Sequence, residues 1–159
     1  MSDLAQKWNP LEDGPMEEIV PSHWIGSHAG KRLADAYRTL AIVPMKSIGA
    51  GSSFWPDYAR DEMPKLEDGE QPRKVQRATP AEISRMEEAI GWAARYLRDD
   101  ADDAPRRIVQ IVAIATAFGR DLDQVCKRRR WYMPTVLRKN RRGLQLIAEG
   151  LNRDGVVPW

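Results

Sequence analysis

The feature that most constrains this chain is a block of cations near its C-terminus. From Lys127 to Arg142 there are eight Lys or Arg residues and no Asp or Glu. Apolar residues recur through the second half of this block at the three- and four-residue spacing of an α-helix. A cationic block on a helix that also has an apolar face is typical of a domain that binds a polyanion.

The helix that carries the second half of the block is expected to span residues 134–152. Pro134 suits its first turn, where the missing N–H group would have had no intrahelical partner. At about 100° per residue, one side collects apolar residues: Leu137, Leu144, Ile147, Ala148 and Leu151. The opposite side collects polar and cationic residues: Thr135, Arg138, Lys139, Arg142 and Gln145.

A shorter helix, residues 122–130, precedes it. Leu122, Val125 and Cys126 are expected to face inward, and the helix ends in four consecutive cations at the negative end of its dipole. The residues between the helices, Trp131-Tyr132-Met133, are apolar, and their aromatic rings are expected to pack the two helices together. Two helices joined by so short a turn form the pattern of a helix-turn-helix.

The pattern predicts binding to double-stranded DNA. Arginine and lysine neutralise phosphates, and arginine also grips a guanine edge with two hydrogen bonds. The residues expected to hold phosphates are Lys127, Arg128, Arg129, Arg130 and Arg141. Those expected in the major groove are Arg138, Lys139 and Arg142, with Thr135 and Gln145 as further groups able to touch bases. A solvated helical hairpin is the plainer alternative, but a solvated helix normally interleaves charges of both signs.

The net charge of +2 conceals two halves of opposite sign. Residues 104–159 hold 12 basic and 4 acidic residues, whereas residues 1–103 hold 13 basic and 19 acidic residues. A chain of 159 residues is expected to form one domain with tails. It contains no apolar run long enough to span a membrane and no secretory signal, so a cytoplasmic, nucleoid-associated protein without membrane partners is expected.

The fold class expected is all-α: a compact domain of about five helices that ends in the helix-turn-helix, with a flexible N-terminal tail. The boundaries predicted are an acidic tail (1–22), a helix plus an irregular Trp-Pro segment (23–78), a helical core (79–152) and a C-terminal tail (153–159). Thr79-Pro80-Ala81-Glu82 is a capping box that begins a helix. In that helix Trp92 is expected to flank an apolar stripe. Residues 105–118 are apolar almost all round and predict the central helix.

Motifs for catalysis or for binding a metal or cofactor are not found in the sequence. Both histidines, His23 and His28, lie near the tail, and no Cys or carboxylate pattern completes a zinc site. Cys126, the one cysteine, is expected to be a small core residue. Four Asp between residues 99 and 103 do not match a calcium loop and are expected to cap the next helix. No enzymatic activity, metal or cofactor is therefore expected.

Three elements carry a resemblance to a known family. They are the helix at Arg32–Leu40, the element Ser53-Phe54-Trp55-Pro56 and the helix at Ile83–Trp92, followed by the C-terminal helix-turn-helix. Over residues 24–152 the chain resembles an uncharacterised family of small bacterial and prophage proteins. The resemblance implies DNA binding through the C-terminal motif. The chain has Met133-Pro134-Thr135 where the family's recognition helix usually begins with a Ser-Arg-Thr type of cap.

Three functions remain open at this stage. The leading hypothesis is a transcriptional regulator, and because one motif buries limited surface, a homo-oligomer or RNA polymerase is expected as a further partner. The second is a DNA-packaging protein like a small terminase subunit. The third, of another class, is a protein–protein interaction adaptor whose basic helix docks on an acidic partner.

Overall fold

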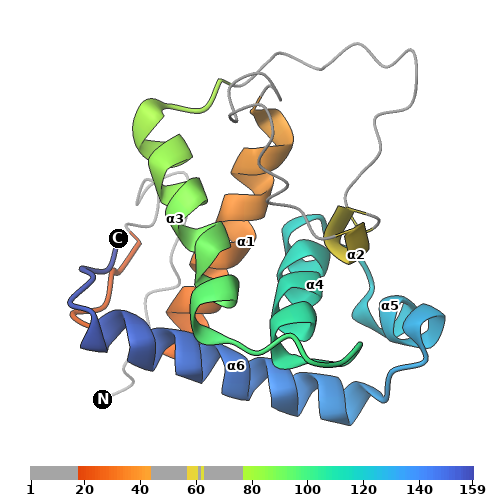
Figure 1. Cartoon of the computed structure of the whole chain (residues 1–159). Coiled ribbons are helices and arrows are strands. Elements are labelled where there is room, and N and C mark those ends of the chain that lie inside the picture. The colour runs from red at the N-terminus through yellow and green to blue at the C-terminus, as the bar shows by residue number, and fades with distance from the viewer. Residues whose placement is uncertain (1–17, 44–56, 61, 63–76) are drawn as a thin grey trace, which may run out of the picture.

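The elements described are all helical, which confirms the all-α fold class. The computed structural model describes residues 18–43, 57–60, 62 and 77–159. Five helices make up most of this part: α1 (Gly26–Ile42), α3 (Pro80–Tyr96), α4 (Pro105–Ala117), α5 (Leu122–Arg129) and α6 (Met133–Arg153). A single turn, α2 (Asp57–Arg60), lies beside α4 and α5 (Figure 1). The element Ser53-Phe54-Trp55-Pro56 falls outside the described residues.

Helix α6 is the element on which the other long helices meet. It runs beneath α1, α3 and α4 and reaches α5 at its N-terminal end (Figure 1), and it contacts all four. Its buried residues are Val136, Gly143, Ile147, Ala148, Gly150 and Leu151. The prediction that Leu137 faces inward was wrong, because 45% of its surface is exposed. Val136 is the residue that enters the core at this turn, and Leu137 lies at the edge of the apolar face.

Two glycines let neighbouring helices approach α6 closely. A Cβ atom at Gly143 would lie 2.6 Å from Cγ2 of Val109 on α4. A Cβ atom at Gly150 would collide with the ring of Tyr96 on α3. Side chains at these positions would push α4 and α3 away, because packed interiors leave no space for an added carbon.

A cluster of tryptophans joins the two ends of the described chain to α3. Trp24 packs edge-on against both Trp92 and Trp159, with ring centroids 5.0 and 5.2 Å apart. The Trp24 indole N–H donates to the carbonyl oxygen of Val156 over 2.9 Å. The Asn152 side chain pairs with both main-chain groups of Trp24 at 2.8 Å. Residues 153–159 therefore cover the core. Trp92, expected at the flank of the α3 stripe, is fully buried at its centre.

Helix α3 begins as its sequence predicts. The Thr79 hydroxyl accepts a hydrogen bond from the Glu82 N–H over 3.2 Å, and the Glu82 carboxylate accepts one from the Thr79 N–H over 2.6 Å. This is the reciprocal arrangement of a capping box. Helix α4 is buried along most of its length, as predicted for the central helix.

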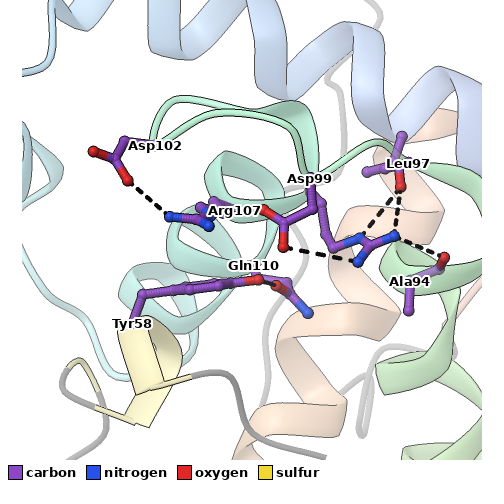
Figure 2. Close-up of polar contacts among 8 residues, drawn as sticks. Tyr58, Ala94, Leu97, Asp99, Asp102, Arg107 and Gln110 are labelled. Carbon is purple, nitrogen blue, oxygen red and sulfur yellow. Dashed lines mark hydrogen bonds and ion pairs between the residues drawn. The ribbon is translucent and has the colours of Figure 1, made fainter.

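The acidic turn before α4 does not cap that helix, contrary to the prediction. The N-cap of α4, Ala104, has no side-chain cap. Instead, Asp99 and Asp102 accept hydrogen bonds from Arg107 over 2.6 and 2.8 Å (Figure 2). The Arg107 guanidinium also lies over the ring of Tyr58, whose hydroxyl donates to Gln110 over 2.6 Å. These carboxylates bind Arg107 and not the first N–H groups of α4, because a guanidinium forms stronger, charge-assisted hydrogen bonds with a carboxylate than a backbone N–H does.

The same turn is held to α3 by the neighbouring arginine. Arg106 donates to the carbonyl oxygens of Ala94 and Leu97, the last carbonyl groups of α3. These groups have no intrahelical partner, and arginine is a residue that commonly satisfies them. Arg106 and Arg107 thus fix how α2, α3 and α4 are joined.

Within the described residues, no helix is long and apolar enough to cross a membrane.

The close contact of α4 with α6 predicts opposite effects of one substitution at two glycines. Gly143→Ala is expected to destabilise the protein by about 1–3 kcal/mol, because the new methyl group meets Val109. Gly91→Ala, in the interior of α3 with nothing within 4 Å, is expected to stabilise it by about 0.5–1 kcal/mol through helix propensity. Urea denaturation measures both; a stabilising Gly143→Ala would contradict the close contact.

Candidate nucleic-acid interface

A short helix, a turn and a long helix make up the candidate interface. Asp121 is the N-cap of α5, and its carboxylate accepts from the Asp123 N–H over 2.9 Å. Arg130 is the C-cap of α5 and has left-handed backbone angles, φ 57° and ψ 38°. The chain then turns back, with the Trp131 N–H donating to the Cys126 carbonyl over 2.8 Å, and α6 begins at Met133.

A second apolar cluster fixes α4, α5 and α6 against one another. Its buried members are Ile108, Cys126 and Val136, one from each helix. Leu122, Trp131, Met133 and Val112 pack around them. Cys126 is 2% exposed, and burial raises the pKa of its thiol, so the cysteine is the core residue that the sequence predicts. The three helices therefore present a rigid outer surface.

In the turn between α5 and α6, one of the two aromatic residues, Tyr132, does not pack as the sequence predicts. Trp131 is partly buried, and the Arg129 guanidinium lies 5.3 Å from the centre of its ring. Tyr132, also expected to pack the two helices together, is 73% exposed. It is the N-cap of α6, and its extended backbone directs its side chain away from the side occupied by its two neighbours.

Four of the ten predicted DNA-binding residues are exposed cations without a partner within the described residues. They are Arg130, Arg138, Arg141 and Arg142. The last three lie within little more than one turn of α6, on the side facing away from the core. Thr135 is partly exposed on the same helix, and Gln145, further along, donates to Glu149 over 3.0 Å.

A buried carboxylate holds two of the remaining cations. Glu62 is 3% exposed, and it accepts hydrogen bonds from Arg128 over 2.6 Å and from Arg129 over 3.0 Å. Arg120 also approaches it, at 3.4 Å. Burial raises the pKa of the Glu62 carboxyl, but the hydrogen bonds from Arg128 and Arg129 outweigh burial and hold it below its ordinary value. Glu62 thereby links α5 to α2, because its own N–H donates to the Ala59 carbonyl over 3.2 Å.

Another carboxylate holds the cation next to Arg138. The Lys139 ammonium donates to the Asp103 carboxylate over 2.6 Å and to the Asp103 carbonyl over 3.0 Å. The hydrogen bond from Lys139 lowers the pKa of Asp103. On α5, Lys127 pairs with Asp123 over 2.7 Å at an exposed site, where such a pair contributes little.

Sequence reasoning missed Glu62 and Asp103 as partners of these cations. Glu62 is 66 residues from Arg128, and Asp103 is 36 residues from Lys139. No local spacing links residues so far apart. Only Asp123 and Lys127, four residues apart on one helix, follow a spacing that a sequence can reveal.

The N-terminus of α6 adds a positive dipole end to this surface. Its first turn contains no acidic residue, and the N-cap Tyr132 makes no side-chain cap. The first N–H groups of a helix have no intrahelical acceptor, and together with the dipole they favour an anion.

Among the described residues, no group of three His, Cys, Asp or Glu side chains is placed to hold a metal ion.

Comparison with known proteins gives one match. A family model described as Domain of unknown function (DUF6362) matches residues 42–147. The chain belongs to this family. Membership of an uncharacterised family agrees with the resemblance noted in the sequence. The DUF6362 match extends from the end of α1 through the turn and the arginines of α6. No curated protein and no solved structure matches the chain.

The left-handed backbone of Arg130 predicts an unusual gain in stability. Arg130→Gly is expected to raise the free energy of unfolding by about 0.5–1 kcal/mol, because glycine adopts this conformation without steric cost. Arg141→Gly, the same chemical change inside helix α6, is expected to lower it by about 1 kcal/mol. Thermal denaturation of both variants tests this; equal losses would show that Arg130 is not strained.

The arginine pairs of Glu62 predict a pH-dependent contribution to stability. At neutral pH, Glu62→Gln is expected to lower the free energy of unfolding by about 1–3 kcal/mol, since it leaves guanidinium groups without their buried counter-charge. The pKa of Glu62 is lower in the folded protein than its ordinary value of about 4.5. The contribution is therefore present above that pH and is lost as the pH falls through the folded-state pKa.

Urea denaturation between neutral and acidic pH measures this contribution as the gap between wild type and Glu62→Gln. The gap should narrow in acid. Glu87→Gln, at an exposed glutamate of α3 without an ion pair within the described residues, should follow the wild type throughout. A gap that stays constant with pH would contradict the role of the carboxylate charge.

Proposed function

We propose that the protein is a DNA-binding protein, acting as a transcriptional regulator, in which α5 and α6 form a helix-turn-helix supported by α4. The observation that carries the proposal is a group of exposed arginines on α6 that have no partner among the described residues: Arg138, Arg141 and Arg142. Their helix is anchored to the rest of the domain along its opposite face.

The dimensions of the segment support the assignment. Helix α5 has 8 residues, and residues 130–132 separate it from α6. Turns of about three or four residues, often with a glycine, join the helices of this motif. Arg130 adopts the left-handed conformation for which glycine is the usual residue. The glycine-like position is therefore present, and an arginine occupies it.

The electrostatics of α6 favour a polyanionic partner. Arg138 and Arg142 lie four residues apart, where like charges repel and destabilise a helix by about 0.2–0.5 kcal/mol. A bound phosphate or guanine edge would relieve this repulsion, and the planar guanidinium matches either one with two hydrogen bonds. On a surface that contacts only water, the repulsion between Arg138 and Arg142 would lower stability without any compensating interaction.

The contacts of the ten predicted residues divide them into three groups. We assign Arg138 and Arg142 to the major groove and Arg130 and Arg141 to phosphates, because these four have no partner in the part of the chain that the structure describes. Arg128 and Arg129 form ion pairs with Glu62, and Lys139 forms one with Asp103, so these three cations also stabilise the fold. Lys127, Thr135 and Gln145 remain candidates at the edge of the contact.

The proposal predicts how arginine substitutions change DNA affinity. Arg138→Ala and Arg142→Ala are each expected to weaken binding to a preferred duplex by about 1–3 kcal/mol if the side chain grips a guanine. Arg141→Ala should weaken binding to all duplexes and reduce the slope of log K against log salt by about 0.9. Fluorescence anisotropy over a salt series measures both effects.

Arg85→Ala provides the control, because Arg85 is an exposed arginine in the first half of α3, whereas Tyr96 at the opposite end of α3 contacts α6. It should bind as the wild type does. Equal losses in Arg85→Ala and Arg138→Ala would reduce the interaction to nonspecific charge. No binding by the wild type at low salt would reject the proposal and favour a protein partner for α6.

The ion pair of Lys139 predicts a variant that binds DNA more tightly. Asp103→Asn should release Lys139 for a phosphate, so the salt slope should steepen by about 0.9. Asp102→Asn removes the same charge from the same turn but leaves the Lys139 pair intact, and Arg107 of α4 keeps its bond to Asp99. Binding titrations of both variants separate the release of Lys139 from the general loss of negative charge; identical slopes would show that Lys139 does not reach DNA.

A further inference from the structure

The N-cap residue of α6, Tyr132, has an exposed aromatic ring that does not belong to either apolar cluster. Tyr132 is 73% exposed, whereas Trp131 and Met133 on either side pack into the cluster around Cys126. Its carbonyl oxygen accepts from the Val136 N–H over 3.1 Å, so the first turn of α6 fixes its backbone. The ring therefore projects from a defined point on a rigid element.

We propose that Tyr132 is a specificity-determining residue whose ring packs against the 5-methyl group of a thymine in the major groove. The inference rests on the proposed DNA-binding function and goes beyond it, because it names a base and the chemical group that is read. It replaces the role in helix packing that the sequence suggested for Tyr132.

The position of Tyr132 supports contact with a base edge. In a helix-turn-helix, residues at the N-terminal end of the recognition helix meet the edges of the bases. Arg130 lies two residues before Tyr132 and Arg138 six residues after it, and both are exposed cations without a partner in the described chain. Phosphate or base contacts by these arginines on either side would hold the ring at the groove.

The chemistry of the ring selects the thymine methyl. Among the groups that base pairs present in the major groove, the 5-methyl group of thymine is the apolar one, and apolar side chains recognise it. The Tyr132 hydroxyl has no partner among the described residues. A hydroxyl bound to a phosphate would raise affinity for every sequence equally, so the two contacts are separable by experiment.

The experiment uses the full chain and DNA sites selected by the wild type from a random duplex library. Each thymine of a selected site is replaced in turn by deoxyuridine, which lacks only the methyl group. Affinities are then measured for the wild type, Tyr132→Ala and Tyr132→Phe. Melting temperatures should be unchanged in both variants, because the side chain is exposed.

At one thymine, deoxyuridine should weaken wild-type binding about fourfold, the value of one buried methyl group. Tyr132→Phe should show the same loss, because it keeps the ring. Tyr132→Ala should bind the thymine site more weakly and should no longer distinguish it from the deoxyuridine site. This coupling between one side chain and one methyl group is specific to direct contact.

Two results would overturn the inference while leaving DNA binding intact. In one, Tyr132→Ala discriminates against deoxyuridine at every position as the wild type does. In the other, Tyr132→Phe loses affinity equally on all sequences, which would assign the hydroxyl to a phosphate. A wild-type protein that selects no sequence would instead refute the sequence-specific function on which the inference rests.

Discussion

The need of α6 to bury one face along its whole length is the constraint on which the rest of the structure depends. Four other helices contact this one helix, and two glycines on it accept close approach by α4 and α3. Arg138, Arg141 and Arg142 therefore lie on the opposite, exposed face. The exposed arginines are a consequence of this arrangement: a helix held rigidly on one side presents its other side in a fixed geometry, which a reader of DNA requires.

Two carboxylates far away in the sequence pair with three cations of the basic segment. Glu62, which lies just after α2, binds Arg128 and Arg129 of α5. Asp103 takes Lys139 and attaches α6 to the turn before α4. The cations of this segment that have no partner among the described residues are concentrated at the turn and on the outer face of α6. Opposite charges within the chain thus narrow a broad basic segment to a compact surface.

Much of the fold could be predicted from the sequence, because its signals are local. The capping box at Thr79, the apolar α4 and the period of α6 each depend on residues within a few turns of one another. The orientations of Trp92, Tyr132 and Leu137 were mispredicted, since contacts with distant parts of the chain, and not local spacing alone, decide which side chains are buried. The partners of Arg128 and Lys139 could not be predicted, because their carboxylates are far away in the sequence.

The measurement that tests the central claim most directly is an NMR titration of the labelled protein with a short DNA duplex at low salt. Chemical-shift changes map the contact without any mutation. We expect the largest changes in amides 130–142, with residues of α1 and of the first half of α3 unaffected. Changes confined to α1 and α3, or none at all, would contradict the claim that the outer face of α6 binds DNA.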